Sequence, residues 1–140
     1  FVVTGVGVAD VFGLPVIYPI HPRARKMMNL FGLKTKGIEL IEPVDYLSFL
    51  QLEAKAKSVL TDSGGVQEET CVLKVPCVTL RDNTERPETL AVGSNVLAGT
   101  SPEKILECTN RMLTIENRWK NPFGNGKAGE RIVKAIRDNL

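Results

Sequence analysis

The sequence predicts one α/β domain in which helices flank a mostly parallel sheet in three layers. Short apolar runs rich in valine and isoleucine alternate with segments of helical periodicity, and this alternation is typical of parallel sheets covered by helices. The length of 140 residues suits a single domain, and no internal repeat or low-complexity segment divides the chain. With 43% hydrophobic and 24% charged residues, the composition is that of a globular protein that buries a core.

The apolar runs are short enough to be strands of a buried sheet. The first twenty residues hold one charge, Asp10, but their glycines, prolines and valines favour two strands joined by a turn over a membrane span. They have neither the basic start nor the small-residue cleavage pattern of a signal peptide. The predicted strands are residues 16–20, 38–41, 59–61, 77–80 and 96–98, with 1–4 as a further candidate.

Six segments have the periodicity of helices. They are residues 23–31, 46–56, 66–73, 87–91, 102–114 and 128–139. Pro102 stands where a first helical residue belongs, behind Thr100 and Ser101 as caps. Thr100 and Glu103 also have the spacing of a capping box. The apolar stripe of this helix is expected to be core and consists of Ile105, Cys108, Thr109 and Met112.

Charge and cysteine content exclude several classes of partner. The 18 basic and 16 acidic residues leave a net charge of +2, which is too balanced to indicate a nucleic acid or a membrane surface. The three cysteines are odd in number and lack C-x-x-C spacing, so we expect buried free thiols in the cytoplasm, and neither a metal site nor a cofactor. Residues 117–129 predict a loop, and Trp119 within it is expected to be a packing residue.

Residues with reactive or ligand-binding side chains follow the predicted strands at one edge of the sheet. In open α/β sheets, ligands bind just beyond the carboxyl ends of the strands. The segments that follow the strands are residues 5–7, 21–23, 42–46, 62–65 and 81–86. Because they collect the only histidine, two pairs of glycines and several charges, the sequence predicts a ligand site at this edge.

The strongest local motif is Ser63-Gly64-Gly65, which lies between a strand and a helix. Two glycines at a helix start leave backbone N–H groups uncovered, and the helix dipole adds partial positive charge, so the motif suits a phosphate. The alternative is a tight turn in which Ser63 only caps the helix. The earlier loop 5–10 begins like a G-x-G-x-x-G fingerprint but breaks it at Asp10, and is weak evidence for nucleotide binding.

Three charged or polar side chains are candidates beside this motif. Glu69 shares a predicted inward helix face with residues 66, 70 and 73, and a carboxylate there can accept hydrogen bonds from a ribose diol or pair with a basic residue. Arg86 precedes the helix start at Pro87 and can clamp a diphosphate or pair with Glu85 or Glu88. His21, at a strand end, can contact phosphate or be structural.

These segments resemble the non-hydrolysing UDP-N-acetylglucosamine 2-epimerases. The resemblance is strongest to the archaeal and related bacterial members of that family. The two specific strings are LTDSGGVQEE at residues 60–69 and LRDNTERPE at 80–88. Supporting strings are PIHPR at 19–23, YLSF at 46–49, KVP at 74–76, GSNVLAG at 93–99 and NPFGNG at 121–126. The resemblance covers the chain from about Pro15 to its end.

The resemblance implies the UDP-binding, Rossmann-like second domain of a two-domain GT-B fold, with residues 1–140 as that single domain and the amino-terminal domain lying outside it. By this resemblance Ser63, Gly64 and Gly65 would receive the diphosphate of UDP or UDP-N-acetylglucosamine. Roles are also implied for the remaining site residues. Glu69 would hold the ribose hydroxyls, and Arg86 and His21 would contact phosphate. Phe49 would lie against uracil, with the backbone of Pro43–Tyr46, including Tyr46, near the base.

The family reaction inverts C2 of the sugar to give UDP-N-acetylmannosamine, by elimination and re-addition of UDP. The acidic catalytic residues would belong to the other domain, so no catalytic residue is assigned in this chain. Members carry a His-Arg-x-Glu-Asn stretch where this chain has residues 5–10, and a helix there is expected to be shortened or deleted. We therefore expect the chain alone to be inactive.

Two further hypotheses remain. One is a non-catalytic module that binds a nucleotide sugar or associates with itself, for example as a homodimer, through an exposed apolar face. The other is a glycosyltransferase domain, which shares the fold but is disfavoured by the two specific strings.

Overall fold

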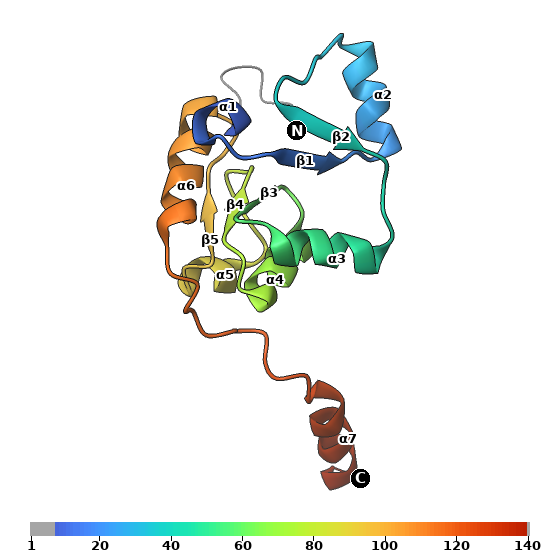
Figure 1. Cartoon of the computed structure of the whole chain (residues 1–140). Coiled ribbons are helices and arrows are strands. Elements are labelled where there is room, and N and C mark those ends of the chain that lie inside the picture. The colour runs from blue at the N-terminus through green and yellow to red at the C-terminus, as the bar shows by residue number, and fades with distance from the viewer. Residues whose placement is uncertain (1–7, 140) are drawn as a thin grey trace.

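The computed structural model describes residues 8–139, which form two parallel sheets flanked by helices (Figure 1). The strands are β1 (Val16–Pro19), β2 (Ile38–Ile41), β3 (Val59–Thr61), β4 (Cys77–Thr79) and β5 (Asn95–Leu97). The helices are α1 (Val8–Phe12), α2 (Pro22–Leu30), α3 (Tyr46–Lys55), α4 (Gly64–Leu73), α5 (Pro87–Ala91), α6 (Pro102–Thr114) and α7 (Ala128–Asp138).

The α/β class is confirmed, but the parallel strands are divided between two sheets rather than joined in one. β1 pairs with β2, and the second sheet has the order β3-β4-β5. Predicted elements within the described residues are present, with bounds that differ by at most two residues. The predicted strand at residues 1–4 lies outside the described residues. The helix expected to be shortened or deleted near residues 5–10 is present as the five-residue α1, where a turn between two strands was expected.

The three-stranded sheet is the centre of the fold, and its strand β4 is buried on both faces. Its side chains alternate between the faces, as the two-residue period of a strand requires. Val78 belongs to the apolar cluster under α6, together with Leu80, Ala98, Ile105 and Met112. Cys77 and Thr79 face the other side, where α4 packs on β3 and β4. The order α6, sheet, α4 confirms the three layers.

The layer beneath α4 is polar although it is buried. Gln67, Thr70, Thr79 and Asn95 are all buried there. Thr79 Oγ1 donates to Asn95 Oδ1 at 2.8 Å, so burial of these groups is offset by hydrogen bonds. Burial also raises the pKa of the Cys77 thiol to about 12. The three cysteines are free thiols, as expected, but only Cys71 and Cys77 are buried, whereas Cys108 is partly exposed.

Two local predictions concern the cap of α6 and the packing role of Trp119, and only the second is fully confirmed. Ser101, not Thr100, caps α6, because it directly precedes Pro102 and its Oγ accepts from the Lys104 N–H at 3.5 Å. The expected capping box at Thr100 is therefore wrong. Trp119 is a packing residue, as predicted: it is buried and its Nε1 donates to the Cys71 carbonyl at 2.9 Å.

The last helix, α7, stands apart from the packed elements (Figure 1). None of its residues is buried, and it exposes Ile132, Val133 and Ile136. Within residues 8–139, no helix combines the length and apolar character that crossing a membrane requires.

Candidate functional site

The turn between β3 and α4 presents the start of a ten-residue helix. Ser63 caps it, because its Oγ accepts from the Val66 N–H at 3.5 Å, and the Ser63 N–H donates to Thr61 Oγ1 at 3.0 Å. The helix cap by Ser63, which was considered as the alternative to a phosphate site, is thus present. It leaves the N–H groups of Gly64 and Gly65 unused, since the first N–H groups of a helix have no partner within it. The turn can therefore be capped and still present donors to an anion.

Arg86 lies against this helix start. A Cβ atom on Gly64 would be in ordinary van der Waals contact with Arg86, 3.7 Å from its Cζ, so the guanidinium lies next to the start of α4. Arg86 directly precedes α5 and Pro87, as predicted, and its side chain forms no capping hydrogen bond. Its Nε forms an ion pair with Glu68, and its Nη1 donates to the Glu85 carbonyl at 3.0 Å. Glu68, not the carboxylate of Glu85 or Glu88, is thus its acidic partner.

A buried hydrogen-bond network holds the Arg86 loop on α4. The Arg86 N–H donates to Thr84 Oγ1 at 3.0 Å, and Thr84 Oγ1 donates to Gln67 Oε1 at 2.5 Å. Asn95 Nδ2 donates to the same Gln67 oxygen at 3.3 Å. Because Gln67 is fully buried, it connects the loop, α4 and β5 in a low-dielectric interior where such bonds are strong.

A surface hollow of about 430 Å³ lies between α3 and α4. It is lined by Tyr46, Leu50, Gly65, Glu68, Glu69, Val72, Leu73 and Phe123. Within residues 8–139, Glu69 forms no ion pair, so the salt bridge considered as its alternative role is not observed among those residues. A hydrogen bond with Glu69 and the charge of that carboxylate raise the pKa of Tyr46. The hollow thus places the Glu69 carboxylate, a hydrogen-bond acceptor, beside the turn formed by Ser63, Gly64 and Gly65 (the glycine turn).

The orientation of α4 differs from the expected one. The fully buried face carries Gln67, Thr70 and Cys71, whereas Val66, Glu69 and Leu73 are only partly buried. The helix is turned because Gln67 bonds to Thr84 and Asn95. Glu69 consequently lies at the border of the buried face, where it lines the hollow.

The remaining predicted site residues, His21 and Phe49, do not line the hollow. His21 is exposed and caps α2, where its Nδ1 accepts from the Arg23 N–H at 3.2 Å. It follows strand β1 of the two-stranded sheet, which carries Tyr18. Burial and then the charge of Asp62 raise the pKa of Tyr18. Phe49 is half-buried on α3 and is not among the residues that line the hollow.

Sequence reasoning missed several residues of the site. Glu68 was not among the predicted site residues, yet it lines the same hollow as Glu69 and forms an ion pair with Arg86. Phe123 comes from the loop after α6, so no local pattern could place it beside α4. Glu53 on α3 is also unforeseen: it is a buried carboxyl group close enough to Glu69 for the two charges to interact.

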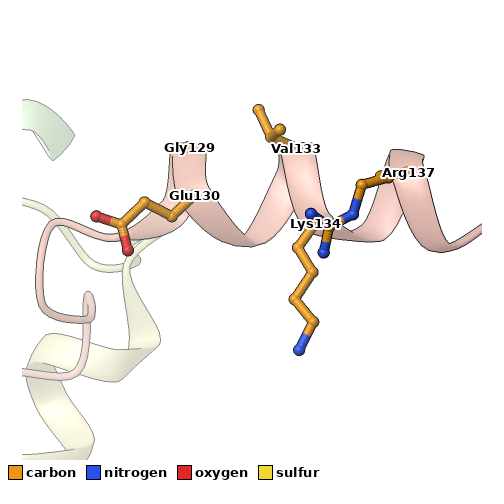
Figure 2. Close-up of a pocket in the computed structure, with 5 residues that line it drawn as sticks. All are labelled: Gly129, Glu130, Val133, Lys134 and Arg137. Carbon is orange, nitrogen blue, oxygen red and sulfur yellow. The ribbon is translucent and has the colours of Figure 1, made fainter.

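A second hollow lies on α7 alone (Figure 2). Its lining residues are Gly129, Glu130, Val133, Lys134 and Arg137. Figure 2 shows these side chains spread along a single helix. A site lined by one helix does not enclose a small molecule, so this hollow is not the candidate site. Among the described residues, no cluster of His, Cys, Asp and Glu has the arrangement of a metal site.

The family model described as UDP-N-acetylglucosamine 2-epimerase matches residues 7–137. The chain belongs to this family. A UDP-N-acetylglucosamine 2-epimerase from Methanocaldococcus jannaschii is 53% identical over 134 residues, which are 92% of this chain and 37% of that protein. One from Methanococcus maripaludis is 56% identical over 126 residues, which are 86% of this chain and 34% of that protein. The chain thus spans about a third of the length of these curated relatives.

Solved structures of the epimerase family have the same fold. The structure of the Methanocaldococcus jannaschii epimerase in complex with UDP-GlcNAc and UDP has a TM-score of 0.86 at 52% identity. The match covers 94% of this chain and 38% of that one. A putative epimerase from Listeria monocytogenes matches with a TM-score of 0.77 at 34% identity and the same coverage. The GT-B assignment expected from the resemblance is supported by these neighbours.

Proposed function

We propose that this chain is the UDP-binding part of an enzyme that converts UDP-N-acetylglucosamine to UDP-N-acetylmannosamine by elimination and re-addition of UDP. The observation that carries the proposal is the convergence of three features on one surface. Gly64 lies beside Arg86, and Gly65 lines the same hollow as Glu69. In support, a relative with 52% identity has been solved with UDP-GlcNAc and UDP bound.

In this proposal each feature binds a different part of UDP. The N–H groups of Gly64 and Gly65, behind the Ser63 cap, and the Arg86 guanidinium receive the diphosphate. Glu69 accepts hydrogen bonds from the ribose hydroxyls. The remaining contacts complete the site: Phe49 and Tyr46 lie near the base, and His21 contacts phosphate from the other sheet.

UDP is the leaving group of the proposed reaction and must also stay bound for re-addition. Donors directed at the diphosphate stabilise the charge that develops on it when the bond to the sugar breaks. This chain therefore contributes leaving-group stabilisation, while the acid–base groups lie outside it. The free thiols are consistent with the cytoplasm as the proposed location.

Calorimetric titration with UDP and UDP-N-acetylglucosamine tests the proposal. We expect both to bind, and Glu69→Ala to weaken binding roughly tenfold to hundredfold, because charged hydrogen bonds to the ribose are lost. Glu107→Ala, an exposed carboxylate on α6, is the matched control and should leave the affinity unchanged. No binding of either ligand would contradict the proposal. Formation of UDP-N-acetylmannosamine would show that the chain itself contains the catalytic groups.

A second candidate function is a non-catalytic module that associates with itself, for example as a homodimer. It is favoured by the exposed Ile132, Val133 and Ile136 on α7, since grouped apolar side chains mark interaction surfaces. Sedimentation velocity separates the candidates: a dimer without nucleotide binding favours the module, and nucleotide binding by a monomer favours the epimerase part.

A further inference from the structure

Glu53 is a buried carboxyl group without a partner. Only 3% of its surface is exposed, and neither carboxyl oxygen has a hydrogen-bond partner among the described residues. No ion pair within residues 8–139 involves it. Glutamate is almost never fully buried unless it is paired, since transfer of an unpaired charge from water is very costly. A role other than packing is therefore worth seeking for this side chain.

The position of Glu53 connects it to the candidate site. Tyr46, Leu50 and Glu53 lie four and three residues apart, so they share one face of α3. The first two line the hollow, and α3 packs on α4. Glu53 therefore continues the wall of the hollow into the interior, one turn beyond Leu50.

Three titratable groups interact with Glu53: Tyr46 on its own helix, Glu69 on α4 and the Cys77 thiol on β4. Only Glu69 is negatively charged at neutral pH, because Tyr46 and Cys77 have raised pKa values and stay neutral. None of these neighbours is basic. Burial first, and then the charge of Glu69, raise the pKa of Glu53 to about 7. The Glu53 carboxyl group is thus close to the midpoint of its titration at neutral pH. A small change in the electrostatic field around it therefore changes the fraction that is protonated.

We propose that Glu53 is a positioning residue for nucleotide binding, and that it takes up a proton from solvent when a nucleoside diphosphate sugar binds beside Glu69. The inference rests on the proposed function. The ligand brings two negative charges to the start of α4, and like charges nearby favour the neutral form of a carboxyl group. Once Glu53 is protonated, it no longer repels Glu69 or the diphosphate. It acts through Glu69 and does not touch the ligand.

The sign of the pH dependence follows from this coupling. Because the complex holds more protons than the free chain, affinity is highest below the pKa of Glu53 and falls as the pH rises through about 7. We expect a loss of roughly threefold to tenfold in affinity between pH 6 and pH 8, since one group can contribute at most tenfold per pH unit. Glu53→Gln mimics the protonated form and should bind with nearly constant affinity over this range.

Calorimetry with UDP-N-acetylglucosamine in PIPES and in imidazole at pH 7 counts the protons taken up. This ligand is suitable because both of its phosphates are esterified and do not titrate near pH 7. We expect net proton uptake by the wild-type chain and by the exposed-site control Glu107→Gln, and none by Glu53→Gln. Uptake that survives in Glu53→Gln but disappears in His21→Asn would assign the proton to His21 and overturn the proposal.

A direct titration covers the case in which Glu53→Gln fails to fold. In the wild-type chain, the ¹³C resonance of the Glu53 carboxyl group should titrate at higher pH with UDP-N-acetylglucosamine than without it. An unchanged midpoint in the saturated complex would overturn the role of Glu53 and leave the proposed function intact. Failure of the wild-type chain to bind at any pH would overturn the proposed function and, with it, this inference.

Discussion

At the scale of single residues, Glu53 connects pH to stability. Its pKa is about 7 in the folded chain and near 4.5 when the group is free, so the folded chain binds more protons between these values. Stability is therefore highest below about pH 4.5 with respect to this group. It falls by on the order of 3 kcal/mol as the pH rises to 7 and beyond. The buried, unpartnered carboxylate is the physical cause.

The test is urea unfolding of the wild type and Glu53→Gln across pH 5 to 8. Glu53→Gln should remove most of the pH dependence assigned to this group and raise stability relative to the wild type at pH 8. Glu107→Gln changes an exposed carboxylate on α6 and should keep the wild-type profile. Parallel profiles for the wild type and Glu53→Gln would show that Glu53 titrates normally.

Glu68 pairs with Arg86, the side chain that we propose binds the diphosphate. The two side chains form an ion pair while both remain partly exposed, so the pair adds at most about 1 kcal/mol to stability. Glu68→Gln should leave the melting temperature nearly unchanged and tighten UDP binding by roughly twofold to fivefold, because Arg86 is no longer neutralised. Glu116→Gln removes a similar exposed pair, with Arg118, and serves as the control. Weaker binding by Glu68→Gln would mean that the pair orients Arg86 for phosphate.

At the scale of elements, α4 and the loop before α5 behave as one unit. Gln67→Leu should lower the free energy of unfolding by roughly 2–4 kcal/mol, because Thr84 and Asn95 then lose a buried acceptor. UDP binding should weaken as well, since Thr84 positions the Arg86 backbone. Chemical denaturation and calorimetry measure the two effects. Thr114→Val, at an exposed hydroxyl on α6, should change neither, and an equally stable Gln67→Leu would contradict the network's role.

At the scale of the whole molecule, the core ends before α7. Truncation after Phe123 should shift the melting temperature by less than about 2 °C, because α7 has no buried residue. Trp119→Ala, only a few residues earlier, should cost roughly 3–5 kcal/mol through the cavity it leaves and the lost bond to the Cys71 carbonyl. Scanning calorimetry compares the two. A fall above about 5 °C on truncation would show that α7 packs on the rest of the chain.

The elements, and the turn on which the candidate site is built, could be predicted because their signals are local. Pro87 and Pro102 mark helix starts, Ser63-Gly64-Gly65 predicts a capped turn with free N–H groups, and the alternation of strands and helices predicts the layers. Each signal depends on hydrogen bonds or periodicity within a few residues. The structure keeps these features where the local pattern placed them.

Long-range packing determined what the local pattern could not. The division into two sheets, the rotation of α4 around Gln67, the choice of Glu68 as the partner of Arg86 and the burial of Glu53 are decided by which elements meet. A charged residue in a helix is exposed by default, and only a neighbouring element can enclose it. Sequence patterns thus determined the helices, the strands and the glycine turn. Contacts between distant segments determined which charges lie together in the candidate site.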